Sequence, residues 1–187
     1  SLIFALFYSQ IFEENRNIVA LIFSITIMFF VGVKDDLQNL SARKKFLGQI
    51  IAVGILMVNS DFRMQSFHGF LGVYELNSFV SIGFSMFLIL GLINSYNLID
   101  GIDGMASIVG IIISSSYGFL FYKLEMLYYL AICITMIAML FAFLRFNFSP
   151  KKKIFMGDTG ALVVGLVLGM LTLKLLSLGV STFSALE

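Results

Sequence analysis

The chain alternates between long apolar stretches and short groups of charged residues. Crossing a bilayer takes about 20 apolar residues, or slightly fewer where flanking side chains snorkel. Six stretches meet this requirement: 17–33, 46–60, 76–99, 104–122, 126–144 and 159–178. A further apolar segment, 1–12, has no charged leader and no clear cleavage site, so we expect the tail of another helix rather than a signal peptide. The pattern predicts an all-α, polytopic transmembrane bundle of about six spans plus a partial N-terminal one, in a single membrane domain, 1–187.

One connection differs from the others in length and composition. Residues 61–75 mix aromatic and polar side chains with two glycines, which favours a short hairpin or interfacial loop on the non-cytoplasmic side. His68 lies in this loop, away from most of the acids, and is expected to be incidental.

The charges of the connections predict the orientation of the bundle. If the crossings alternate, connections 34–45, 100–103 and 145–158 share one side of the membrane, with eight basic residues against four on the other. Basic residues favour the cytoplasm, so this side is predicted to be cytoplasmic. Five of the six aspartates also fall there: Asp35, Asp36, Asp100, Asp103 and Asp158.

Composition excludes several classes of protein. The chain is 59% hydrophobic and only 12% charged, which excludes an ordinary soluble domain and a disordered chain. Its net charge of +1 provides no field for binding nucleic acid. The single cysteine excludes an internal disulfide framework and a thiolate zinc site, and the single histidine argues against a histidine metal site within this chain.

The first charged segment places Asp35 and Asp36 side by side at the end of a span. Adjacent carboxylates there are costly unless a cation neutralises them. Nearby basic side chains provide one explanation: Lys34, Arg43, Lys44 and Lys45. Mg²⁺ provides another, because it prefers oxygen ligands and is often held by one or two carboxylates together with substrate phosphates.

The second segment repeats a polar side chain every third residue, at Asn94, Asn97, Asp100 and Asp103. A straight helix would turn the first and last of these half a revolution apart. Glycines 101 and 104 allow the backbone to break, so all four side chains are expected to line one cavity. A polar helix cap is the alternative explanation, but a cap needs only one Asn or Asp and not four at this spacing.

The third segment, 145–160, enters the last span. Its lysines 151–153 are explained by topology or by attraction to anionic lipid. Its end places Asp158 at a helix start between two glycines, where free N–H groups and the helix dipole favour a phosphate or a metal–phosphate complex. Phe155 is expected either to stack on a base or to lie at the membrane interface.

Together these segments resemble the polyprenyl-phosphate N-acetylhexosamine-1-phosphate transferases. The resemblance runs from about Val31 to Leu168 and is most specific in 94–106 and 154–161. It implies a bacterial inner-membrane enzyme whose active site faces the cytoplasm. Such an enzyme moves a sugar 1-phosphate from a UDP-sugar to undecaprenyl phosphate, releases UMP, requires Mg²⁺ or Mn²⁺, and serves cell-envelope polysaccharide synthesis.

The resemblance also implies roles for individual residues. Asp35 and Asp36 match a catalytic pair near the attacking lipid phosphate, and Asp158 matches a metal-binding aspartate, assisted by Asp100 or Asp103. Asn147 and Phe155 fall where the family contacts uridine, and Lys44 or Lys45 matches a basic residue of the phosphate site. The candidate substrate-binding residues are Lys44, Lys45, Asn94, Asn97, Asp100, Asp103, Asn147 and Phe155.

The chain departs from the family at both ends. Members have more membrane helices before the aspartate pair and a histidine-rich cytoplasmic loop after the last span seen here. The chain is therefore predicted to be a fragment of such an enzyme.

Several alternatives stay open at this point. Within the family, the donor is expected to be UDP-GlcNAc or another UDP-HexNAc, with phospho-MurNAc-pentapeptide transfer as the alternative. Asp35 is expected to deprotonate the lipid phosphate or to act as a nucleophile. A proton or ion transporter would spread its acids through the bilayer depth, whereas these cluster at one face. A purely structural subunit and a homodimer also remain possible from sequence alone.

Overall fold

A computed structural model describes residues 2–58, 62–69 and 72–178, with backbone alone for 2–16. The described part forms six helices and no strand, which confirms the predicted all-α polytopic fold. Five helices are long and apolar enough to cross a membrane, counting α1 from Asn17 onward, and α2 is shorter at 16 residues. The helices are α1 (Leu2–Gln38), α2 (Ala42–Met57), α3 (Ser78–Ile99), α4 (Met105–Lys123), α5 (Leu127–Asn147) and α6 (Gly157–Ser177).

The helices match the predicted spans to within a few residues, with one correction. Segment 1–12 and span 17–33 were expected to be separate crossings joined by a loop at 13–16, but α1 runs through all of them without a break. The four residues at 13–16 include glutamate and arginine, which favour helix, and contain neither proline nor glycine. Charge at this point therefore does not end the helix.

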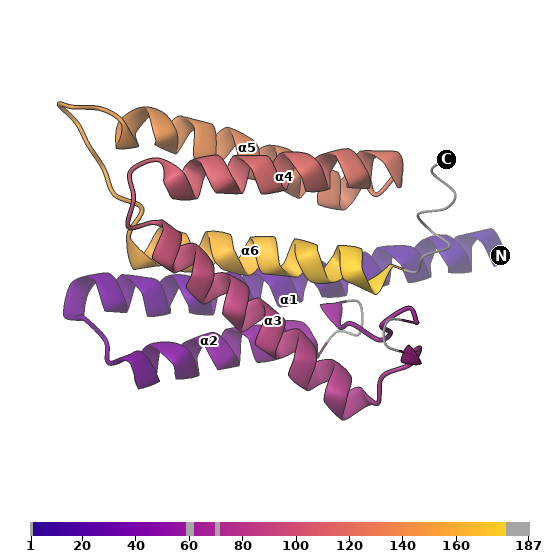
Figure 1. Ribbon diagram of the computed structural model, residues 1–187. Helices are drawn as coiled ribbons and strands as arrows, with labels where there is room; N and C mark the ends of the chain where they lie inside the picture. Colours follow the sequence, from indigo (N-terminus) through magenta and orange to yellow (C-terminus); the bar gives the residue numbers. More distant parts are fainter. Residues whose placement is uncertain (1, 59–61, 70–71, 179–187) are drawn as a thin grey trace.

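Helix α6 lies at the centre of the bundle. It packs against α1 and α3 on one side and faces the α4–α5 pair on the other (Figure 1). Side chains around its whole circumference are buried, including Leu166, Met170 and Leu171. The outer helices instead expose large apolar side chains such as Phe30 and Phe87. This distribution is the one expected of a bundle whose outer surface faces lipid.

Glycine allows α3 and α6 to approach each other closely in the bundle core. A Cβ atom on Gly165 of α6 would lie 2.9 Å from the Cα atom of Ile93 in α3. Small residues at such positions let two backbones approach and gain van der Waals contact, which drives helix association in membranes. The α3–α6 interface therefore depends on the absence of a side chain at this position.

Helices α4 and α5 form a hairpin whose two arms pack mainly against each other. The ring of Phe121 near the end of α4 stacks on Tyr129 near the start of α5, with centroids 5.2 Å apart. Contacts between this pair and the rest of the bundle are fewer, and they include the hydrogen bond from the Tyr117 hydroxyl to the Thr172 hydroxyl of α6, 2.9 Å long.

The predicted hairpin is present between α2 and α3. Ser66 and Glu75 form an antiparallel bridge, and the Ser81 hydroxyl of α3 donates to the carbonyl oxygen of Met64 at 2.7 Å. The Met64 N–H in turn donates to the Ser85 hydroxyl at 2.9 Å. These hydrogen bonds fasten the hairpin to the first two turns of α3.

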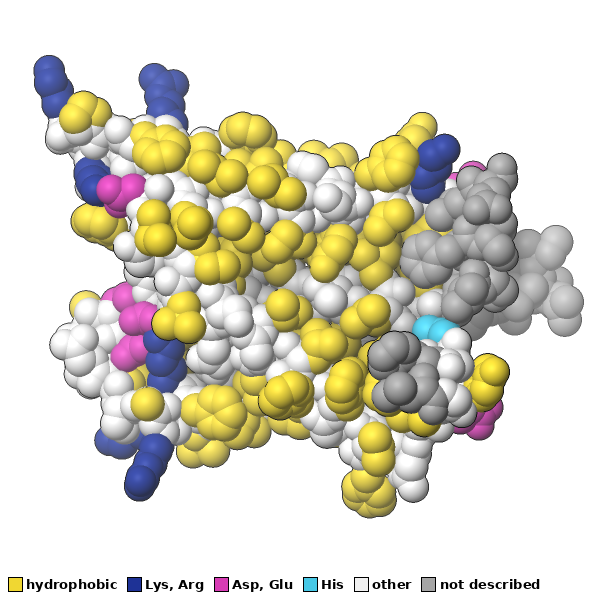
Figure 2. Space-filling view, in the orientation of Figure 1, with side chains coloured by type: hydrophobic (Ala, Val, Ile, Leu, Met, Phe, Trp, Pro, Cys, Tyr) yellow, Lys and Arg dark blue, Asp and Glu magenta, His cyan; other side chains and the backbone are white. Residues whose placement is uncertain are grey.

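The connections alternate between the two ends of the bundle, as the sequence predicted. Those after α1, α3 and α5 gather at one end, which carries the five cytoplasm-assigned aspartates and is called the acid end below (Figure 1). The hairpin and the α4–α5 turn lie at the other end, called the hairpin end. Figure 2 shows charged side chains at both ends and hydrophobic ones between them.

Adding one methyl group at the α3–α6 contact is expected to destabilise the bundle. In Gly165→Ala the new Cβ meets backbone atoms of Ile93, which cannot move aside cheaply, so we expect a loss of about 1–3 kcal/mol. Thermal unfolding in detergent measures the effect. The matched control is Gly91→Ala in α3, where a Cβ meets nothing within 4 Å. Equal unfolding midpoints for the two variants would contradict the proposed packing.

Candidate functional site

The acid end is organised by a carboxylate that caps α6. Asp36, in the last turn of α1, accepts hydrogen bonds from the Asp158 N–H at 2.8 Å, the Thr159 N–H at 3.0 Å and the Thr159 hydroxyl at 2.5 Å. The first N–H groups of a helix have no partner within it and carry partial positive charge, so a carboxylate is stabilised there. This contact joins the α1 end to the α6 start.

Two glycines make this contact possible. A Cβ atom on Gly32 of α1 would lie 2.4 Å from the Thr159 Cα, so no larger residue allows α1 to come this close to α6. Gly157 has a φ of +67°, a conformation that side chains rarely adopt, and a Cβ there would lie 3.1 Å from the Asp36 carboxylate.

Lys45 lies between two carboxylates. Its ammonium group forms ion pairs with Asp158 and, at 2.8 Å, with Asp35, which is only 6% exposed. The other oxygen of Asp35 accepts from the Leu40 N–H at 2.7 Å. Partial burial lowers the pKa of Lys45, but the hydrogen bonds and charges of Asp158 and Asp35 outweigh it, so the pKa is raised overall. Lys45 is therefore a fixed positive charge at this site.

A fourth carboxylate approaches from α3. Burial raises the pKa of Asp100 from 3.8 to about 6. A hydrogen bond from the Gly157 backbone opposes the shift, and the charges of Asp158 and Asp36 add to it. Four aspartates from three chain segments thus surround the start of α6, and we call them the aspartate cluster: Asp35, Asp36, Asp100 and Asp158.

The donor set fits a magnesium ion shared with a substrate. Among the described residues, no group of three or more histidine, cysteine, aspartate or glutamate side chains is placed to hold a metal ion alone. Mg²⁺ usually takes only one or two protein carboxylates and fills its shell with phosphate oxygens and water. Asp35 and Asp158 already share one cation, the Lys45 ammonium, so their oxygens converge on one point.

Asp103 lies outside the aspartate cluster. Its carboxylate pairs with Lys153 of the α5–α6 connection at 2.5 Å, and both side chains are well exposed. The same ammonium lies 5.1 Å from the ring centroid of Phe155, which is 70% exposed. These three residues form a rim beside the cluster, where an aromatic face and a cation are open to a ligand.

Asn147 holds the rim in place. It is buried at the end of α5, where its side-chain oxygen accepts from the Gly104 N–H at 2.6 Å and its amide donates to the Ile154 carbonyl at 2.8 Å. Sequence suggested contact with uridine, which stays a prediction. The structure gives this side chain a different task, because it ties the α3–α4 turn to the loop that carries Phe155.

The expectation that four polar side chains of 94–103 line one cavity is not met. Helix α3 continues to Ile99, so Asn94 lies about 9 Å below Asp100 along the axis. There the Asn94 amide donates to the Gln49 side chain of α2 at 2.9 Å. Asn97 is half-buried one turn before Asp100. Of the four, the structure brings only Asp100 to the cluster.

Three residues of this end were not among the predicted ones. Thr159 completes the Asp36 contact, Lys153 pairs with Asp103, and Gln49 pairs with Asn94. Gln49 could have been recognised as a single amide within the otherwise apolar residues 46–58. Of the two candidate lysines, Lys45 forms ion pairs within the cluster and Lys44 is exposed.

Lys44 instead lines a groove on the outer surface. The groove has a volume of about 460 Å³ and lies between α1 and α2. Its walls are apolar, and its polar groups are Lys34 and Lys44, near the acid end. An amphiphile with an anionic head and an apolar tail matches this arrangement. The lining residues are Ile27, Phe30, Val31, Lys34, Leu40 and Lys44.

A membrane bundle with a carboxylate cluster and lysines at one end suits chemistry on phosphates. Comparison with known proteins identifies the family. The protein-family model for glycosyl transferase family 4 matches residues 18–176 of the sequence. The chain therefore belongs to glycosyl transferase family 4.

Two relatives illustrate the range of the family. The chain is 34% identical over 190 residues to a phospho-N-acetylmuramoyl-pentapeptide-transferase of Staphylococcus epidermidis, covering 94% of this chain and 59% of the relative. It is also 34% identical over 177 residues to a probable undecaprenyl-phosphate N-acetylglucosaminyl 1-phosphate transferase of Bacillus subtilis, covering 94% and 49%. The chain thus spans half to three fifths of the length of these relatives.

Removing the Lys45 ammonium is expected to make the stability of the protein depend on divalent cations. In Lys45→Met, Asp35 and Asp158 face each other without a counter-charge, so we expect a loss on the order of 2 kcal/mol in chelator. Mn²⁺ or Mg²⁺ should then raise the unfolding midpoint more in this variant than in the wild type. Lys44→Met is the control and should behave as wild type. Equal cation-induced shifts in all three proteins would rule out a shared cation position.

The raised pKa of Asp100 predicts a pH effect on stability. Between pH 3.8 and about 6 the folded protein retains a proton on Asp100 that the unfolded chain loses. The free energy of unfolding therefore falls as the pH rises through this range, and the ionised Asp100 destabilises the folded state above it. Asp100→Asn should therefore raise the unfolding midpoint in chelator at pH 7.5 and leave it nearly unchanged at pH 4. A variant that is equally stabilised at both pH values would contradict burial as the cause.

Proposed function

We propose that the full protein transfers a sugar 1-phosphate from a UDP-sugar to a polyprenyl phosphate. The observation that carries this proposal is the Lys45 ammonium held between Asp35 and Asp158 at the start of α6. Membership of glycosyl transferase family 4 supports it, as do the names of the two relatives.

The charges of the acid end suit two substrates that both bear phosphates. The N-terminus of α6 and Lys45 supply positive charge within the cluster, and Lys153 supplies it at the rim. Phosphoryl transfer depends mainly on position and on neutralising charge, which these groups provide. We place the uracil ring on exposed Phe155 and the donor diphosphate over the aspartate cluster.

The acceptor is placed in the groove between α1 and α2. Its isoprenoid chain would lie on the apolar walls, and its phosphate would meet Lys34 and Lys44, which are the basic groups of the groove. Lys45 follows Lys44 in the first turn of α2, so the acceptor phosphate and the cluster are adjacent. An apolar groove open to the side of the bundle admits a lipid directly from the bilayer.

The reaction is a displacement at the β-phosphorus of the donor. An oxygen of the acceptor phosphate forms the new P–O bond, the bond to the α-phosphate oxygen breaks, and UMP leaves with that electron pair. Mg²⁺, held by Asp158 and Asp35, would neutralise the donor phosphates. Asp35 orients Lys45 toward the phosphates, and the acceptor oxygen is already ionised near neutral pH, so direct attack demands less than a covalent route through Asp35.

We infer that the acid end faces the cytoplasm of a bacterial inner membrane, because its connections carry eight basic residues against four at the other end. The simple-sugar donor, UDP-GlcNAc or another UDP-HexNAc, is our first choice. Phospho-MurNAc-pentapeptide transfer is the second, favoured by the name of the Staphylococcus epidermidis relative.

The proposal predicts loss of transfer when the cluster is altered. In the full-length protein, Asp158→Asn and Lys45→Met should each lower transfer from a radiolabelled UDP-sugar to undecaprenyl phosphate by a factor on the order of 100 or more. Activity should require Mg²⁺ or Mn²⁺, and a panel of UDP-sugars identifies the donor. Glu125→Gln at the hairpin end is the control and should retain full activity. Wild-type transfer by Asp158→Asn would refute the assignment.

A further inference from the structure

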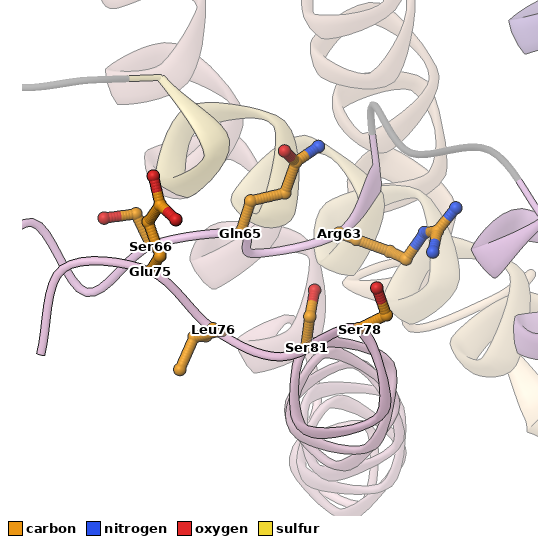
Figure 3. A pocket seen from close by; sticks show the side chains of 7 residues that line it. All are labelled: Arg63, Gln65, Ser66, Glu75, Leu76, Ser78 and Ser81. Carbon is orange, nitrogen blue, oxygen red and sulfur yellow. The ribbon is translucent and has the colours of Figure 1, made fainter.

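The hairpin end contains a pocket that the proposed reaction does not use. It has a volume of about 510 Å³, within the range of about 300–1,000 Å³ typical of small-ligand sites. The hairpin forms one wall and the first turn of α3 forms the other (Figure 3). The residues that line it are Arg63, Gln65, Ser66, Glu75, Leu76, Ser78 and Ser81.

The pocket carries opposite charges at its two sides. Figure 3 shows Glu75 beside Ser66 at one side, Arg63 at the other, and the two serines of α3 in between. A guanidinium group binds phosphate through paired hydrogen bonds, and a carboxylate accepts hydrogen bonds from an ammonium group. The pocket therefore matches a ligand with a phosphate at one end and an ammonium at the other. A purely anionic ligand would meet the Glu75 carboxylate.

The pocket adjoins the start of a helix that is long enough to span a membrane, so we expect it at the level of the phospholipid headgroups. Ser78 is the first residue of α3, a helix long and apolar enough to span a membrane. The next two residues, Phe79 and Val80, are 88% and 53% exposed, so an apolar surface begins directly beside the polar pocket. Tyr74 of the hairpin is 70% exposed, and tyrosine is common at the membrane interface.

The pocket is held in shape by the contacts that fasten the hairpin. The Ser81–Met64 and Met64–Ser85 hydrogen bonds fix the Arg63 side of the pocket to α3. The Ser66–Glu75 bridge fixes the other side, and the His68 ring bonds to the Leu176 carbonyl at the end of α6 at 3.2 Å. Preorganised walls lower the entropic cost of binding a ligand.

We propose that this pocket binds the headgroup of a zwitterionic, amine-bearing phospholipid. The phosphate lies at Arg63 and Ser78, the ammonium lies at Glu75, and the acyl chains follow the exposed Phe79 and Val80 surface of α3. This proposal does not depend on the transferase reaction, because the site lies at the opposite end of the bundle.

Native mass spectrometry of the full-length protein tests the proposal, with phosphatidylethanolamine, phosphatidylcholine and phosphatidylglycerol offered at equal amounts. The wild type should retain phosphatidylethanolamine at least 10-fold over the other two lipids. Arg63→Gln should lose this retention. Glu75→Gln should lose the preference and bind phosphatidylglycerol equally well, because the repelling carboxylate is gone.

Matched controls use the other connection at the same end. Lys123→Gln and Glu125→Gln alter exposed charges of the α4–α5 turn by the same chemistry and should leave lipid retention unchanged. Thermal unfolding confirms that all four variants fold. Equal retention of the three lipids by the wild type, or unchanged retention in both pocket variants, would overturn the proposal. So would displacement of the lipid by millimolar soluble phosphoethanolamine, which would indicate a water-soluble ligand.

Discussion

The hydrogen bonds between the Asp36 carboxylate and the start of α6 determine the arrangement of the acid end. They connect residues 122 positions apart in the sequence and satisfy N–H groups that no other part of α6 can reach. Gly32 and Gly157 leave the space for this contact. This contact brings Asp35 of α1 and Asp158 of α6 to the same place, where Lys45 of α2 pairs with both. The arrangement of the aspartate cluster therefore depends on how two membrane helices are joined.

The acid end also shows how a membrane protein keeps charge at low cost. An unpaired ion near the apolar layer is unfavourable, so each carboxylate of the aspartate cluster has a partner. Asp36 uses helix N–H groups, Asp35 and Asp158 share one lysine, and Asp100 accepts from the Gly157 backbone. The shared lysine therefore neutralises two carboxylates from different helices at once.

Sequence predicted the helices and the meeting of the three acidic connections, because apolar length and alternation of sides leave few other arrangements. It could not predict which side chains pair within that end. The Lys45 contact, the Asp103–Lys153 pair and the Asn94–Gln49 pair depend on how far each helix is rotated and where it ends. The chain does break at Gly101 and Gly104 as expected, but Asn94 and Asn97 lie within α3 before this break, so Asn94 is separated from Asp100. The charged residues at 13–16 were predicted to form a loop, and this was wrong. Local charge indicates a connection only when a helix breaker accompanies it.

The spacing of the Lys45 contacts bears on the order of assembly during synthesis. Asp35 and Lys45 are ten residues apart at the α1–α2 turn, so we expect this ion pair to form once α1 and α2 have been synthesised. Asp158 arrives 113 residues after Lys45, on the last of the described helices. On this order of synthesis, the Asp35–Lys45 pair precedes Asp158, and insertion of α6 brings the second carboxylate to Lys45.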